Sequence, residues 1–165
     1  FTMAQIPEVI FQTYDKGWGQ FNSLDLIEDK RIVIFALPGA FTPTCSNFQL
    51  PAYEEAYDDI RNEMIDEVYC LSVNDTFVMN AWFKQLGIEK VKPIPDGNGE
   101  FTNAMGMSIP KTNRGFGFRS WRYAMVVDHG EIEMTFVEDG KIGNCPSDPY
   151  LVSDPQTVLK YLKSK

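Results

Sequence analysis

The apolar positions in the first half of the chain predict alternating strands and helices. Residues 31–37 and 67–73 are almost continuously apolar, which is typical of short strands buried on both faces. Between them, residues 44–62 carry apolar side chains at helical spacing, and Pro51 should end or kink the first part of this segment. A strand, a helix and a second strand in this order predict a parallel pair.

The second half of the chain changes to alternating apolar and polar positions. Two such runs flank Asp128-His129-Gly130, which predicts an antiparallel hairpin with His129 in its turn. The other elements are marked by caps, glycines and prolines at their ends. In order after the second strand we expect a helix from a cap at Asn74 or Asp75 to a stop at Gly87, an extended piece at 91–94, a short helix at 100–105 before Gly106, strands at 121–127 and 131–137, and a last helix after Ser153-Asp154-Pro155.

This order predicts an α/β fold with one mixed sheet. The sheet should be parallel in its first half and antiparallel in its second, with helices on both faces. Such an order is typical of a thioredoxin-like domain with extra N-terminal residues and insertions. Because no repeat, low-complexity segment or linker divides the sequence, residues 1–165 are expected to form a single domain.

Composition and charge narrow the class of protein. The hydrophobic fraction of 44% and the charged fraction of 23% are typical of a folded globular chain. The net charge of −8 argues against nucleic acid or an anionic membrane as partner. No apolar stretch approaches a length of about 18 residues, and no secretory signal is visible. Together with a low count of 3 cysteines, this leads us to expect a reducing, cytoplasmic setting.

Cys45 is the main candidate for chemistry. It follows the first apolar run and a turn that begins at Pro38, so we expect it at the start of a helix. Helix N-termini stabilise negative charge and lower the pKa of cysteines placed there, from about 8.5 toward 3.5–7.5. Thr42 can present its hydroxyl to the same pocket, and Pro43 stiffens the turn. A buried structural thiol is the competing interpretation.

The other two cysteines have different surroundings. Cys70 lies within the second apolar strand, where a core thiol with a raised pKa is expected. Cys145 lies in a loop rich in Gly, Pro and Asn, residues 141–149, so we expect it to be accessible. It could resolve an oxidised Cys45 by forming a disulfide, or it could be an incidental surface cysteine.

The absence of certain residues excludes other thiol chemistries. His129 is the only histidine, and its sequence context predicts a turn residue. This argues against a Cys-His hydrolase, which needs a histidine as base. The residue three positions after Cys45 is Phe48, so there is no C-x-x-C motif for a dithiol oxidoreductase or a zinc site. No metal or cofactor is therefore expected. Arg122, at the start of an apolar strand, is the candidate cation beside the thiolate.

These residues resemble a peroxiredoxin of the peroxiredoxin 5 type. Its Pro-x-x-x-Thr-x-x-Cys signature is met by Pro38, Thr42 and Cys45, within Pro-Gly-Ala-Phe-Thr-Pro-Thr-Cys-Ser. The likeness extends over nearly the whole chain. It implies that Cys45 is the peroxidatic cysteine, that Thr42 contacts thiolate and peroxide, and that Arg122 activates the thiol. It also implies that Pro38 shields the pocket and that Phe116 lines it near a dimer contact.

The resemblance implies a thiol peroxidase and leaves its reduction open. Hydrogen peroxide and alkyl hydroperoxides would oxidise Cys45 to a sulfenic acid. The reductant could be Cys145, glutathione, glutaredoxin or thioredoxin, and a homodimer is expected. The Asp148-Pro149-Tyr150 tail is similar to that of bacterial relatives linked to a glutaredoxin domain. The alternative is a non-enzymatic, thioredoxin-like binding module or chaperone.

Overall fold

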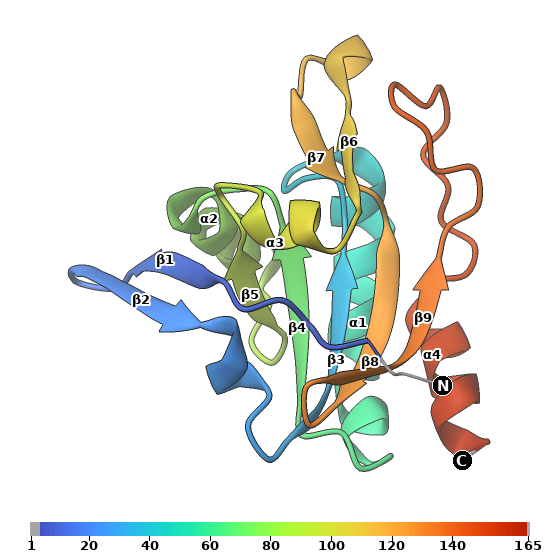
Figure 1. Ribbon diagram of the computed structural model, residues 1–165. Coiled ribbons are helices and arrows are strands. Elements are labelled where there is room, and N and C mark those ends of the chain that lie inside the picture. Colours follow the sequence, from blue (N-terminus) through green and yellow to red (C-terminus); the bar gives the residue numbers. More distant parts are fainter. Residues whose placement is uncertain (1–3, 165) are drawn as a thin grey trace.

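A five-stranded mixed sheet forms the centre of the structure, a computed structural model that describes residues 4–164 (Figure 1). Its strand order is β5-β4-β3-β8-β9. β3 pairs with β4 in parallel and with β8 antiparallel, so the predicted change of direction occurs at β3. The bounds are β3 Arg31–Ala36, β4 Glu67–Ser72, β5 Lys92–Pro95, β8 Tyr123–Asp128 and β9 Glu131–Val137. The predicted mixed sheet is confirmed.

Helices cover both faces of the sheet, as predicted. One face packs against α1 (Leu50–Arg61), α2 (Thr76–Leu86) and α4 (Pro155–Lys163). Phe35 of β3 stacks on Tyr53 of α1 with ring centroids 3.8 Å apart, which joins sheet and helix at the centre of this layer. The other face is covered by α3 (Glu100–Ala104) and by the N-terminal segment with its hairpin (Figure 1).

The predicted helix boundaries follow from local chemistry. The Asp75 carboxylate accepts a hydrogen bond from the Val78 N–H at 2.9 Å and caps α2. Gly87 ends the same helix with φ 69°, a left-handed conformation that glycine adopts without steric cost. Asp154 caps α4, and Pro155 occupies its first turn. His129 lies exposed in the β8–β9 turn with φ 52°, so its predicted place in a turn is confirmed.

Two small hairpins lie outside the predicted elements. β1 (Ile10–Tyr14) and β2 (Trp18–Asn22) form one, which continues into a short 3-10 helix, η1 (Ser23–Leu26). β6 (Ser108–Pro110) and β7 (Phe118–Ser120) form the other, with the 3-10 turn η3 (Thr112–Arg114) between them. The strands of β6–β7 have only 3 residues each, too few for a periodic pattern. This second hairpin stands beyond the carboxyl end of β3, where the candidate site lies (Figure 1).

No helix within residues 4–164 is long and apolar enough to cross a membrane.

Candidate active site

Cys45 opens the helical turn that follows the carboxyl end of β3. It begins η2 (Cys45–Gln49), a π-helical turn that continues directly into α1. The Leu50 N–H donates to the Cys45 carbonyl, five residues back, and the Trp82 indole N–H donates to Ser46 Oγ at 2.8 Å. The predicted helix-start position is therefore confirmed, and the Cys45 side chain is fully buried.

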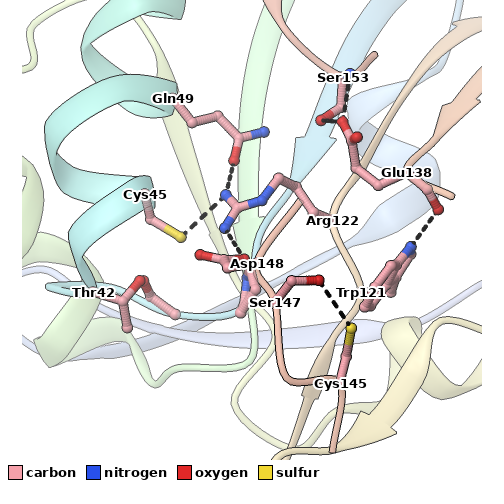
Figure 2. A network of polar contacts seen from close by, with 12 residues as sticks. Thr42, Cys45, Gln49, Trp121, Arg122, Glu138, Cys145, Ser147, Asp148 and Ser153 are labelled. Atoms are coloured by element: carbon pink, nitrogen blue, oxygen red, sulfur yellow. Dashed lines mark hydrogen bonds and ion pairs between the residues drawn. The ribbon is translucent and has the colours of Figure 1, made fainter. Parts of the chain in front are cut away.

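Arg122 lies beside the sulfur because of the sheet pairing. Antiparallel pairing sets Ala36, the end of β3, opposite Tyr123, the start of β8. Arg122 therefore reaches the same end of the sheet as Cys45, and its Nη1 lies 3.3 Å from Cys45 Sγ (Figure 2). The sequence-predicted pair of thiol and cation is brought together, although the two residues are far apart in the chain.

Arg122, whose side chain is only 1% exposed, makes three further contacts that compensate its buried charge. Nη1 also donates to the Gln49 amide oxygen, and Nη2 donates to Asp148 Oδ1 at 2.6 Å. The Tyr150 ring lies 5.7 Å from the guanidinium carbon. Burial lowers the pKa of Arg122, but the negative charges of Cys45 and Asp148 outweigh it and the pKa is raised. The guanidinium thus stays charged inside the protein.

A second arginine joins the other predicted pocket residues. Arg119 of β7 donates through Nη1 to the Pro38 carbonyl and through Nε to the Phe116 carbonyl, both at 3.1 Å. Its guanidinium carbon also lies 5.1 Å from the centre of the Phe116 ring. Burial lowers the pKa of Arg119, and the charge of Cys45 opposes this shift. Pro38 is buried and Phe116 is half-buried. Arg119 links these two predicted pocket residues, because it binds the backbone carbonyl of each.

Thr42 precedes the thiol by three residues and is held by the turn itself. Its hydroxyl donates to the Gly39 carbonyl at 2.7 Å, and its own carbonyl accepts from the Ser46 N–H at 2.9 Å. The hydroxyl proton is therefore engaged, while the lone pairs of Oγ1 stay available to accept a hydrogen bond. Among residues 4–164 no group of three or more acidic, histidine or cysteine side chains could hold a metal ion.

Comparison with known proteins assigns the family. Residues 3–149 match the Redoxin family. The chain belongs to this family and is a peroxiredoxin, a thiol peroxidase. A peroxiredoxin from Rhizobium etli is 50% identical over 170 residues, covering 97% of this chain and 95% of the relative. The alternative of a non-enzymatic binding module is thereby set aside.

Two other proteins are similar to nearly the whole of this chain. The hybrid peroxiredoxin of Haemophilus influenzae is 48% identical, and the match covers 96% of this chain but only 64% of that protein. The solved 1-Cys peroxiredoxin of Plasmodium falciparum, an antioxidant protein, has a TM-score of 0.94 at 35% identity and covers 99% of this chain and all of its own. The thioredoxin-like fold of this peroxiredoxin is thereby confirmed.

Three residues at the peroxiredoxin site escaped the sequence reasoning. Gln49 follows Cys45 by four positions, a helical spacing that could have revealed it. Arg119 precedes Arg122 by three positions, but its contact with Pro38 depends on the β6–β7 hairpin. Asp148 lies in an irregular loop, where no periodic pattern predicts the direction of a side chain.

The two remaining cysteines lie within the protein. Cys70 is fully buried in β4, and burial raises its pKa well above the usual range, as expected for a core thiol. Cys145 was expected to be accessible, and this expectation is wrong because its side chain is only 7% exposed. It packs against Ile109 and Trp121, since its loop folds back onto the β6–β7 hairpin through the hydrogen bond from Asn144 N–H to the Pro110 carbonyl.

Proposed function

We propose that Cys45 is the peroxidatic cysteine and that it reduces hydrogen peroxide and alkyl hydroperoxides. The thiolate attacks the terminal peroxide oxygen in line, an S–O bond forms and the O–O bond breaks. The leaving oxygen takes a proton and departs as water or alcohol, while Cys45 becomes a sulfenic acid. The observation that carries this proposal is the 3.3 Å contact between Cys45 Sγ and the buried, charged Arg122.

Each group around Cys45 would have its own role in the reaction. Arg122 stabilises the thiolate and the negative charge that develops on the leaving oxygen, an effect worth roughly 3–4 kcal/mol for a well-placed donor. The Thr42 hydroxyl donates its hydrogen bond to the Gly39 carbonyl, so Oγ1 can accept a hydrogen bond from the peroxide hydroxyl. N–H groups of the first helical turn add further donors. Pro38 and Phe116, held by Arg119, restrict the entry of water.

The first test compares two buried thiols that differ in their neighbours. Cys45→Ser should abolish peroxide consumption, because a serine hydroxyl is not ionised at neutral pH, and should leave the circular dichroism spectrum unchanged. Cys70→Ser is the matched control and should retain the wild-type rate constant for peroxide. Turnover by Cys45→Ser, measured by loss of peroxide with a thiol reductant, would refute the assignment.

We further propose that an external thiol, glutathione or a glutaredoxin- or thioredoxin-type protein, reduces the sulfenic acid. Cys145 was a candidate resolving cysteine, but it is packed against Trp121 and contacts Ser147 Oγ at 3.5 Å. A disulfide with Cys45 would require this loop to leave the β6–β7 hairpin. An external reductant requires only that the site opens toward solvent.

Peptide mapping by mass spectrometry after stoichiometric peroxide tests the route of reduction. With glutathione present, we expect a mixed disulfide on Cys45 and an unmodified Cys145. A Cys45–Cys145 disulfide would contradict the external route and would assign Cys145 as the resolving residue. Cys145→Ser provides the matched control, since an external route predicts an unchanged turnover number with glutathione.

The setting of the enzyme is also proposed. We propose that residues 1–165 act as a single domain in a cytoplasmic homodimer. Apolar side chains near the site support the dimer, since Phe41 and Phe118 are 47% and 66% exposed. The three free thiols support a reducing compartment.

A further inference from the structure

The loop at residues 144–153, here named the crossing loop, is anchored on both sides of Asp148. Before Asp148, the Asn144 side-chain oxygen accepts from the Thr112 hydroxyl at 2.9 Å and from the Asn113 N–H at 3.0 Å. After it, the buried Glu138 carboxylate accepts backbone N–H groups of the loop at 2.8–2.9 Å, from Leu151, Val152 and Ser153. The loop therefore presents Asp148 from a fixed position.

Asp148 shares one cation with the thiol. Its Oδ1 accepts from Arg122 Nη2 at 2.6 Å, while Nη1 of the same guanidinium lies 3.3 Å from Cys45 Sγ. Figure 2 shows both groups directed at the terminal nitrogens of Arg122. The Asp148 side chain is 39% exposed and Cys45 is buried, so the carboxylate is the solvent-exposed partner of this shared cation and the thiol is the buried one.

The other titratable groups around the sulfur add positive charge or none. Arg119, from β7, contributes a second cation that interacts with Cys45. Burial raises the pKa of Cys70, from β4, and the pKa of Tyr150, from the crossing loop, so both stay neutral at physiological pH. Two arginines alone would attract anions of any kind. Asp148 offsets one of these charges through its ion pair with Arg122.

We propose that Asp148 is a positioning and selectivity residue: its carboxylate holds the Arg122 guanidinium against Cys45, and its negative charge disfavours anionic hydroperoxides relative to neutral ones. The same charge restrains ionisation of the thiol, because two anions beside one cation repel each other. This inference rests on the proposed role of Cys45 as the peroxidatic residue.

Asp148→Asn removes the charge and keeps an oxygen that can accept from Nη2, whereas Asp148→Glu keeps the charge and serves as the matched control. Two readouts separate the electrostatic role from a structural one. The first is the midpoint of the alkylation-versus-pH curve of Cys45, followed by peptide mass spectrometry. The second is the ratio of rate constants for a carboxylate-bearing tertiary hydroperoxide and for its neutral methyl ester.

In Asp148→Asn we expect the alkylation midpoint to fall by about one pH unit. The anionic-to-neutral rate ratio should rise by roughly threefold to tenfold. Asp148→Glu should stay close to wild type in both. Added salt should lower the ratio in Asp148→Asn more than in the wild type, because screening weakens the attraction that the two uncompensated arginines exert on an anion. Asp148→Ser removes the same charge and repeats these measurements if Asp148→Asn fails to fold.

Each failure has a distinct signature. An unchanged midpoint and ratio in the variant that lacks the charge, or a ratio whose salt dependence matches that of the wild type, would overturn the role of Asp148. Neither result would affect the assignment of Cys45, which depends on the loss of peroxide consumption in Cys45→Ser. Conversely, alkylation of Cys45 can be followed without turnover, so the electrostatic part of the inference is measured independently of the peroxidase assay.

Discussion

Two arginine–carboxylate pairs lie at opposite ends of the sheet, and they use the guanidinium differently. At the start of β3, Arg31 binds Glu133 through two parallel hydrogen bonds, with Nε to Oε1 at 3.0 Å and Nη2 to Oε2 at 2.7 Å. The remaining Nη1 donates to the Glu63 carbonyl at 3.3 Å. Both side chains of this pair are about one-fifth exposed, at 20% and 18%. All three nitrogens of Arg31 are thus engaged in a peripheral ion pair.

Arg122 is more deeply buried and less completely paired. It meets Asp148 through Nη2 alone, directs Nη1 at Cys45 and Gln49, and leaves Nε without a partner in the described residues. Burying a charge in this way is costly unless geometry and partners compensate. In the role proposed for it, Arg122 stabilises a reactive anion at a cost in folding stability, whereas Arg31 joins two strands through its ion pair with Glu133. The same substitution at both positions should therefore have opposite effects.

The largest effect is expected for Arg122→Met, which keeps much of the side-chain volume and removes the charge. The rate constant for peroxide should fall by about 10²- to 10³-fold, because a donor to the leaving oxygen is lost. The alkylation midpoint of Cys45 should move to higher pH, since the thiolate loses its cation. Stopped-flow kinetics and pH-dependent alkylation measure the two effects.

The stability of Arg122→Met tests the comparison independently. Removing one partner of a buried ion pair is costly when the other charge stays buried, but Asp148 is 39% exposed and can be hydrated, and the cost of burying the guanidinium is removed with it. The free energy of unfolding should therefore change by no more than about 1 kcal/mol. Arg122→Lys keeps the charge but not the fork of donors, so its activity should lie between those of wild type and Arg122→Met. A strong loss of stability with normal kinetics would reverse the comparison.

Contacts between residues close together in the sequence could be predicted, whereas contacts between residues far apart in the sequence mostly could not. The placement of Cys45 at the start of a helix is local, because the turn after β3 fixes it, and the sequence predicted it. Arg122 was identified because the chain offers no histidine at the site, although its contact with Cys45 depends on the register of β3 and β8. The contact of Asp148 with Arg122 could not be predicted, since nothing local in the sequence links the two residues.

The loop around Cys145 shows where the sequence pattern misleads. The loop around Cys145 has the composition of an exposed loop, yet contacts with Trp121 and with the β6–β7 hairpin bury the thiol. The strands of this hairpin are too short to be recognised from the sequence. The long elements of the sheet were predicted because their apolar periodicity reflects burial directly. The irregular segments that complete the site depend on tertiary contacts that no periodicity records.

A smaller and opposite effect is expected for Arg31→Met. Loss of the bidentate pair leaves Glu133 partly buried without its guanidinium, and the free energy of unfolding should fall by about 1–2 kcal/mol, between the values for exposed and buried pairs. For a chain of this length that corresponds to a decrease in Tm of roughly 2–8 °C. Arg31→Lys should recover only part of this loss, because one ammonium cannot form both parallel bonds. Peroxide kinetics should match the wild type, since Arg31 lies at the opposite end of β3 from Cys45. Chemical denaturation should therefore detect a loss only in Arg31→Met, and stopped-flow kinetics a loss only in Arg122→Met. A kinetic defect in Arg31→Met as large as that of Arg122→Met would show that the two ends of the sheet are not independent.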